Sequence, residues 1–282
     1  MSAEMAPTLS GFPAGYNKIH MLWIGGKLST MERLAMASFL ANGHPVVLHT
    51  YGEVEGVPAG VEVRPGNLVL SEEVVFANVR DGIGKGGFAG FSDWFRYELL
   101  KKEPGFWCDT DVICLAPFEF NQTNIVATSH EGQWGTPALG CVLRLASDDP
   151  LLNFCLDFCR TNNVAELVAK EYIAVGPGLL QRGIRELGLQ HYQEHPDTFC
   201  PITWRHTRFI VKPAPDRMIF NLKRRIRGGE FARRIPPRSK GVHLWQSTWK
   251  LGGIDPDASH NPFSLYERLK AKYLRNEASS PA

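Results

Sequence analysis

Two carboxylates one residue apart interrupt an apolar run of the chain. Asp109 and Asp111 lie within residues 105–115, between Phe-Trp-Cys on one side and Val-Ile-Cys-Leu on the other. Because residues i and i+2 of a β-strand point to the same side, both carboxylates would converge on one point at a strand end. Two buried carboxylates this close repel each other unless a cation or a shared proton lies between them. Oxygen ligands favour Mg²⁺ or Mn²⁺, and Mg²⁺ sites commonly pair one or two carboxylates with substrate phosphates. We therefore expect a divalent-metal site that holds a diphosphate; the alternative is a turn that carries two aspartates by chance.

The segment before the aspartates predicts a helix that brings further charges to the same place. Ser92 is a suitable N-cap for a helix through about Lys102, which a Pro-Gly pair ends. Asp93 and Arg96 are spaced i,i+3 and share one face of this helix. Since the helix leads directly into the apolar run, we expect both side chains to lie beside the carboxylates. The alternative is a surface ion pair worth a few tenths of a kcal/mol.

The elements around this region predict an α/β fold. Short apolar runs at 18–24, 45–51 and 61–63 are typical of buried strands, and residues 30–42 have the pattern of a helix. Strand, helix and strand at this spacing form a βαβ unit, so a single, mostly parallel sheet with a right-handed crossover is expected. Later strands are predicted at 124–128 and 138–145, and helices at 151–160, 164–172 and 179–187. The glycine-rich residues 80–91 formally match a dinucleotide fingerprint but follow no strand, so a flexible active-site loop is the better prediction.

Composition and charge exclude several classes of protein. A chain of 282 residues suits one large α/β domain or two small ones, and its net charge of +2 does not indicate nucleic-acid binding. No window approaches 18 apolar residues, and residues 1–17 lack the pattern of a secretory signal. The six cysteines lie mostly in apolar runs without a CxxC pair, which favours buried free thiols in a reducing compartment over a zinc site. We therefore expect a cytoplasmic protein.

One part of the chain has a strong excess of basic residues. Residues 217–240 are strongly basic and hold a single acid, Glu230. Basic helices often contact anionic lipid, so one hypothesis is peripheral contact with an anionic membrane at its inner face. A solvated basic face is the alternative.

Five motifs, in order over residues 18–250, resemble one family. Ser92-Asp93-x-x-Arg96-Tyr97, followed by Asp109-Thr-Asp111, is similar to the DXD-containing sugar transferases with the GT-A fold, and most of all to the glycosyltransferase family 32 group. That group includes α-1,6-mannosyltransferase initiators, α-1,4-galactosyltransferases and bacterial capsule transferases. The remaining motifs are Ile19-His20-x-x-Trp23-Ile-Gly25-Gly26, Gly176-Pro177-Gly178, and His243-x-Trp245 with Trp249-Lys250. The family usually has Gly-Gly-x-Tyr before its aspartates, where this chain has Pro104-Gly105 and Trp107.

The resemblance implies roles for the matching residues. Asp111 would ligate Mn²⁺ or Mg²⁺ directly, and Asp109 would bind the metal, the ribose or the donor sugar. His243 would be the third protein ligand, although a lone histidine in an apolar strand is otherwise a core residue. The implied contacts to the nucleotide-sugar are Trp23 and Ile24 at the base, Tyr51 stacked on the base, Asp93 and Arg96 at the sugar and diphosphate, and Trp245, Trp249 and Lys250 in the C-terminal motif. Glu131 and Gln133 are the candidates for an acceptor-contacting loop.

The resemblance also implies the reaction and its setting. The chain would be a metal-dependent hexosyltransferase that moves a sugar from a UDP-hexose or UDP-N-acetylhexosamine, or second from GDP-mannose, to a glycan or lipid-linked acceptor. Retention of configuration is implied, and no catalytic base is assigned. The expected organisation is an N-terminal arm (1–16), a GT-A domain (17–252) and a C-terminal helix and tail (253–282). Alternatives are a toxin-like transferase that glycosylates a protein, a haloacid-dehalogenase-type phosphotransferase with Asp109 as nucleophile, and a silent nucleotide-sugar binder.

The two carboxylates also yield an expectation for stability. If Asp109 and Asp111 repel each other, Asp111→Asn should leave the melting temperature intact or raise it.

Overall fold

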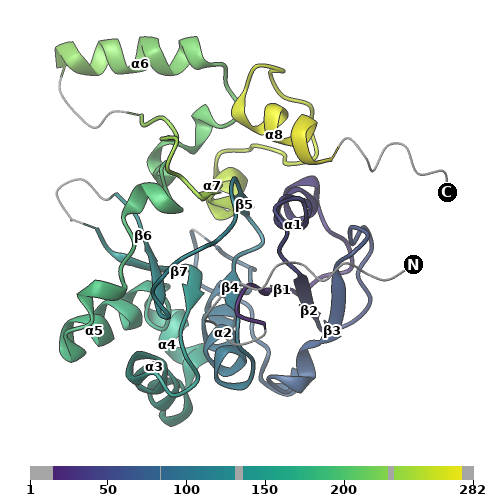
Figure 1. Ribbon diagram of the computed structural model, residues 1–282, viewed down its shortest axis with the longest axis vertical. Coiled ribbons are helices and arrows are strands. Elements are labelled where there is room, and N and C mark those ends of the chain that lie inside the picture. The colour runs from purple at the N-terminus through teal and green to yellow at the C-terminus, as the bar shows by residue number, and fades with distance from the viewer. Residues whose placement is uncertain (1–14, 83, 131–135, 228–231, 275–282) are drawn as a thin grey trace.

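The computed structural model describes residues 15–82, 84–130, 136–227 and 232–274 (Figure 1). Its main sheet has six strands in the order β3-β2-β1-β4-β7-β6. The strands are β1 (Ile19–Trp23), β2 (Val46–Thr50), β3 (Glu62–Pro65), β4 (Phe106–Cys108), β6 (Ile125–Thr128) and β7 (Ala138–Arg144). The pairs β3/β2, β2/β1 and β1/β4 are parallel, whereas β4/β7 and β7/β6 are antiparallel. A second, antiparallel sheet joins β5 (Val112–Cys114) to β8 (Gly241–His243). The predicted α/β class, with a mostly parallel sheet and a small antiparallel part, is confirmed.

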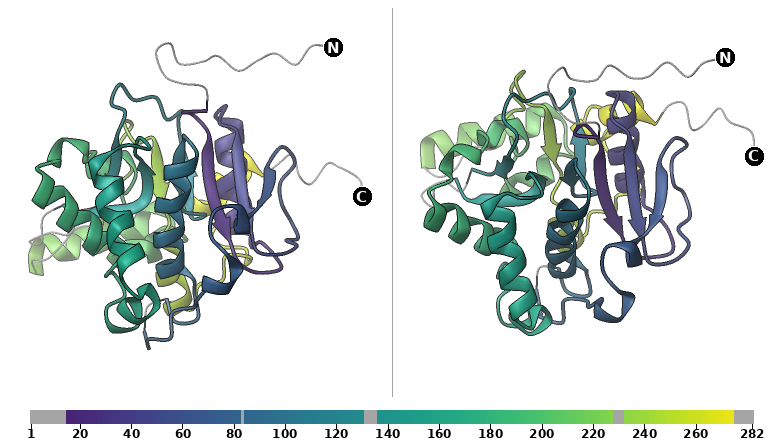
Figure 2. Two further views of the ribbon diagram at one scale, coloured as in Figure 1. Left: turned by 90° about the horizontal axis from the view of Figure 1, so that it is seen from below. Right: turned by 60° about the horizontal axis from the view of Figure 1, so that its bottom comes forward.

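Helices cover both faces of the main sheet. They are α1 (Thr30–Ala41), α2 (Ala89–Lys102), α3 (Pro150–Thr161), α4 (Val164–Lys170), α5 (Pro177–Leu187), α6 (Ala214–Arg227), α7 (Gln246–Leu251) and α8 (Leu265–Tyr273). Short 3₁₀ turns occur at Gly66–Leu68, Glu72–Val74, Gln190–Tyr192, Pro196–Thr198 and Trp204–Phe209. Figures 1 and 2 show the sheet between two helical layers, one with α1, α7 and α8 and the other with α2, α3 and α4.

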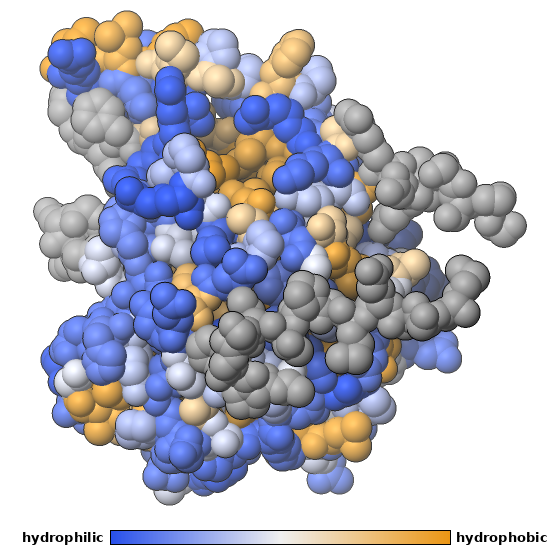
Figure 3. Space-filling model, in the orientation of Figure 1, coloured by the Kyte–Doolittle hydropathy of each residue, from blue (hydrophilic) through white to orange (hydrophobic). Residues whose placement is uncertain are grey.

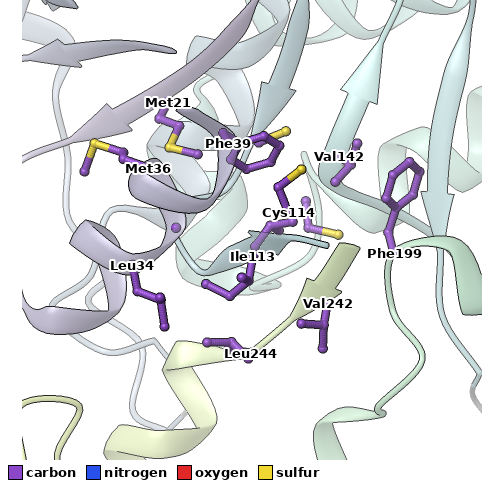
Figure 4. Close-up of a cluster of buried hydrophobic side chains, with 14 of the residues drawn as sticks. Met21, Leu34, Met36, Phe39, Ile113, Cys114, Val142, Phe199, Val242 and Leu244 are labelled. Atoms are coloured by element: carbon purple, nitrogen blue, oxygen red, sulfur yellow. The ribbon is translucent and has the colours of Figure 1, made fainter. Parts of the chain in front are cut away.

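Strand alternation sends side chains into two separate cores. On β1, Met21 points into the core with α1 and β5, and Leu22 points into the core with α2 and α3. Figure 4 shows the first core, where Phe39 of α1 and Ile113 of β5 lie among the buried side chains. All six cysteines are buried and free, as predicted for packed thiols. No described helix has the length and apolar character needed to cross a bilayer.

The helix boundaries follow from capping and close packing. Ser29 and Glu32 form a capping box that starts α1 where the sequence predicts it. The prediction that Ser92 caps α2 is wrong, because the helix begins at Ala89 and its N-cap is Phe88, four residues earlier. Its first turn packs against α4, where a side chain on Gly90 would lie 2.6 Å from Val168. Glycine therefore permits this close contact, and the helix gains a turn.

The apolar run around the aspartates is not one strand, which corrects the prediction. β4 ends at Cys108, and β5 begins at Val112 in the other sheet. The backbone N–H of Val112 donates to the carbonyl of Asp109 at 3.1 Å, which closes a turn over the aspartates. The predicted helix at 164–172 ends earlier, at Lys170. The predicted domain boundary at residue 252 stays a prediction.

Candidate metal centre

The turn that carries the aspartates is held from two sides. The N–H of Asp109 donates to the carbonyl of Cys141 on β7 at 2.9 Å, and the N–H of Leu244 donates to the carbonyl of Asp111 at 2.9 Å. The turn thus connects the main sheet to the end of β8. Its geometry brings ligand atoms of Asp109, Asp111 and His243 to within 4.8 Å of one another. The convergence expected from strand alternation occurs, but a turn produces it.

Asp111 and His243 form a buried pair. Nε2 of His243 lies 3.2 Å from Oδ1 of Asp111, and the backbone N–H of Gln246 donates to Oδ2 at 2.8 Å. Burial alone raises the pKa of Asp111, but the charge of His243 and these hydrogen bonds outweigh it, so the pKa lies below its usual value. Burial lowers the pKa of His243, whereas the opposing charge of Asp111 raises it well above its usual value.

This pairing changes the stability expected of Asp111→Asn. Asp111 faces a favourable partner in the folded protein, and the amide would lose the charge-assisted contact to His243. We now expect Asp111→Asn to lower stability rather than preserve or raise it.

Asp109 is oriented by two donors. Nη2 of Arg96 lies 3.1 Å from its Oδ1, and the indole N–H of Trp107 donates to the same oxygen at 2.8 Å. Nη1 of Arg96 pairs with Asp93 at 2.6 Å within α2, as the i,i+3 spacing predicts. Both of these contacts to Asp109 end on Oδ1, and its side chain is 29% exposed. Oδ2 is therefore available to a ligand from solvent.

Burial sets the charge state of the pair on α2. The Arg96 side chain is 5% exposed and that of Asp93 is 10% exposed. Burial raises the pKa of Asp93 to about 6, although the Arg96 charge opposes this, and the neighbouring Asp109 raises it further. The depth of this pair excludes the alternative of a loose surface ion pair.

Two glycines permit this pair to lie where it does. A Cβ on Gly140 would lie 1.8 Å from Nη1 of Arg96, and one on Gly176 would lie 2.2 Å from Oδ2 of Asp93. The hydroxyl of Tyr97 also donates to the carbonyl of Val175 at 2.9 Å, which fixes α2 to the chain before α5. The glycine at position 176 of the Gly176-Pro177-Gly178 motif therefore leaves room for the Asp93 carboxylate.

Three residues close to the Asp109–Asp111–His243 cluster are not predicted from the sequence as part of the site. The side-chain amide of Gln246 donates to Glu32, which is fully buried and caps α1, so Gln246 bridges Glu32 and Asp111. Tyr172 hydrogen-bonds with Ser247, and its pKa is raised to about 12 by burial and then by Asp93 and the two site aspartates. Tyr172 therefore presents a neutral hydroxyl beside the carboxylates. The capping pattern reveals Glu32 as a helix start, but only the fold reveals its second contact.

The predicted donor-side residues lie at the carboxyl edge of the parallel strands. Trp23 ends β1 opposite Thr50 of β2, so Ile24 and Tyr51 leave the sheet side by side. β4 pairs with β1 in the same direction, which places Asp109 at this edge as well. The Tyr51 hydroxyl donates to the carbonyl of Leu70 at 2.8 Å. Among the described residues, buried Nε1 of Trp23 has no hydrogen-bond partner.

The residues of the C-terminal motif lie in different surroundings: Trp245 is beside His243, whereas Trp249 is in the hydrophobic core. The Trp245 ring lies 4.2 Å from the His243 ring, and its φ of 60° is the only positive value for a non-glycine residue in the described parts of the chain. The indole of Trp245 donates to the carbonyl of Ile202 at 2.7 Å, which holds this uncommon backbone conformation. Trp249 is buried against Tyr266, and Lys250 is exposed on α7. Their contacts to a donor stay predictions, and Glu131 and Gln133 lie outside the described residues.

The donor atoms of the cluster fit a hard divalent cation. Two carboxylates and one imidazole suit Mn²⁺ or Mg²⁺ together with phosphate oxygens. A second group, Cys141 and Cys200, lies on the other side of His243, with its Nδ1 4.0 Å from Sγ of Cys200. Burial raises the pKa of Cys141 well above its usual value, which disfavours the thiolate form that would bind a metal. The partly exposed Asp109 favours the carboxylate side as the metal site.

Comparisons with known proteins find structural likeness without sequence likeness. No protein-family model and no curated protein matches the chain. One solved structure, described as PaToxG glycosyltransferase, superimposes with a TM-score of 0.45 at 14% identity, over 93% of this chain and 87% of that chain. Another, described as a transferase mutant, gives a TM-score of 0.40 at 10% identity, over 65% of this chain and 91% of that chain. At such scores, function has to be derived from the site itself.

Proposed function

We propose that the protein is a metal-dependent glycosyltransferase of the GT-A type that uses a nucleotide-sugar donor. The observation that supports this most is the convergence of Asp109, Asp111 and His243 at the carboxyl edge of parallel strands. Ligands of open α/β sheets bind at this edge, and this donor set suits a cation that carries phosphate. We propose a UDP-hexose or UDP-N-acetylhexosamine as donor, with GDP-mannose second.

In this proposal, the chain's own residues bind and orient the diphosphate. Asp109, Asp111 and His243 hold Mn²⁺ or Mg²⁺, which when bound offsets the charge that develops on the leaving nucleotide. Arg96 and Trp107 fix Oδ1 of Asp109, so that Oδ2 faces the ligand. Because this pre-set geometry exists before substrate binds, little reorganisation is needed during reaction.

The transfer exchanges one bond to the anomeric carbon for another. The bond between that carbon and the diphosphate oxygen breaks, and its electron pair stays on the diphosphate. The acceptor oxygen bonds to the same carbon and loses its proton, which the departing phosphate oxygen can accept. We propose retention of configuration and assign no protein base.

The acceptor is part of the proposal. We propose a glycan or lipid-linked acceptor in polysaccharide biosynthesis, with contact to an anionic membrane through part of residues 217–240. A protein acceptor is the alternative, and the two are separated by which acceptor becomes labelled from a radiolabelled donor.

The reaction class can be tested without knowing the acceptor. Nucleotide release from a panel of UDP- and GDP-sugars is measured with Mn²⁺ or with EDTA. We expect metal-dependent release from one donor, and its loss in Asp111→Asn. Asp157→Asn, on the exposed side of α3, is the matched control and should release nucleotide like the unmodified protein. The absence of release from every donor, together with the absence of metal-dependent nucleotide binding, would refute the proposal.

A further inference from the structure

Helix α6 carries a row of apolar side chains that faces away from the protein. Met218, Ile219, Leu222 and Ile226 are 56%, 54%, 62% and 81% exposed. Their spacing of i, i+1, i+4 and i+8 places all four on one side of a helix. We call these four residues the α6 stripe. Figure 3 shows hydrophobic residues along the outer edge of the region that Figure 1 labels α6.

The other side of α6 fixes this orientation. The ring of Phe220 packs against Phe209 at 5.0 Å and against His206 at 5.6 Å. The side chain of Asn221 exchanges two hydrogen bonds of 2.9 Å with the backbone of Ala232. Because Phe220 lies on nearly the opposite side of the helix from the α6 stripe, these contacts leave the stripe in solvent.

The basic side chains around α6 fall into two groups with different surroundings. Arg233 and Arg238 both pair with buried Asp197, so their charges hold the fold together. Lys223 and Arg225 are exposed on α6, next to the stripe, and have no ion pair within the described parts of the chain. They remain available to an external anion.

Positive charge continues along the same helix. Burial lowers the pKa of Arg217, and the positive charges of Arg234 and Arg268 lower it further. Asp216 is the one acid within α6. The face that presents the stripe is therefore bordered by cations.

We propose that the α6 stripe and its basic border bind the surface of an anionic lipid bilayer. Apolar side chains on a basic amphipathic helix insert at the level of the headgroups, while lysine and arginine contact anionic lipid. A second copy of the chain fits less well, because two such helices placed face to face would oppose like charges. This inference deepens the membrane contact included in the proposed function by naming the surface that makes it. It does not depend on the proposed reaction, since no residue of the stripe belongs to the Asp109–Asp111–His243 cluster.

Vesicle flotation tests the proposal. The protein is mixed with vesicles of phosphatidylcholine alone or with added phosphatidylserine. We expect flotation with the anionic vesicles and little with the neutral ones. Ile219→Ser/Leu222→Ser/Ile226→Ser should weaken binding at least about tenfold, because three apolar side chains leave the lipid. Lys223→Gln/Arg225→Gln should weaken binding about fivefold for each charge removed.

The controls make each outcome decisive. Leu68→Ser removes a side chain that is 68% exposed outside α6, and it should float like the unmodified protein. Since the stripe is exposed, its variants should keep their melting temperature; if the triple variant unfolds, Ile226→Ser alone is used. The proposal would be overturned by equal binding to both vesicle types or by unchanged binding of the stripe variants. It would also be overturned if the protein bound no vesicles and instead self-associated in a way that the triple variant abolished.

Discussion

Replacing Gly140 with alanine would place a methyl group inside the ion pairs that orient Asp109. The added Cβ would lie 1.8 Å from Nη1 of Arg96, whereas ordinary contact begins at 3.4 Å. The guanidinium would have to move by about 1.6 Å, more than its hydrogen bonds to Asp93 and Asp109 can tolerate. A single methyl group on β7 thus tests whether Arg96 positions the metal ligand.

The cost follows from the burial of these charges. Arg96 is 4% exposed, so water cannot replace the contacts that it loses. Breaking a buried pair from one side costs about 3–5 kcal/mol, although relaxation of the backbone can reduce this. We expect Gly140→Ala to lower the free energy of unfolding by about 3 kcal/mol and to weaken Mn²⁺ binding by about tenfold.

Urea unfolding and Mn²⁺ titration of the same preparations measure both effects. Gly26→Ala is the matched control, because its added Cβ would meet nothing within 4 Å. The control should change stability by less than about 0.5 kcal/mol. If Gly140→Ala behaved like Gly26→Ala in both measurements, the positioning role of Arg96 would be refuted.

Further predictions concern stability. His20 and His49 are buried, and burial lowers their pKa values to about 4 and about 3. Because the same side chains in the unfolded chain bind protons near pH 6.5, the free energy of unfolding should fall by a few kcal/mol as the pH falls from 6.5 to 4. A urea midpoint that stays constant over this range would contradict the buried neutral pair. Ser29→Ala removes the capping box of α1 and should cost about 1 kcal/mol without changing Mn²⁺ affinity. Trp249→Phe should lower the free energy of unfolding by about 1–3 kcal/mol, because the indole hydrogen bond is lost, and it should leave the KM for the donor unchanged. A raised KM with unchanged stability would show that Trp249 contacts the donor instead. Asp111→Asn should lower the free energy of unfolding by about 1–3 kcal/mol, and a higher free energy of unfolding would show that repulsion between Asp109 and Asp111 dominates instead.

Local patterns in the sequence predict much of the fold. The apolar runs that became β1 and β2 and the helical pattern at 30–42 predict the βαβ unit, because strand and helix patterns depend on residues close in sequence. The spacing of Asp93 and Arg96 likewise predicts their pair, since i and i+3 are neighbours on any helix.

Contacts between distant segments could not be predicted in the same way. Alternation of apolar residues cannot distinguish a continuous strand from two strands separated by a turn, so it does not predict the change of sheet after Asp109. Gln246 and Glu32 are 214 residues apart, and no local pattern indicates that they meet. In residues 217–240 the basic charges are visible in the sequence, whereas the exposure of Ile226 depends on how Phe220 packs against Phe209.

The most direct test of the account is Mn²⁺ binding followed by electron paramagnetic resonance, with and without UDP or GDP. We predict one Mn²⁺ per chain, bound more tightly when one of the two nucleoside diphosphates is present. Asp111→Ala and His243→Ala should each abolish this binding, while Asp157→Ala should leave it unchanged. Mn²⁺ binding that is undiminished in the Asp111 and His243 variants would contradict the account.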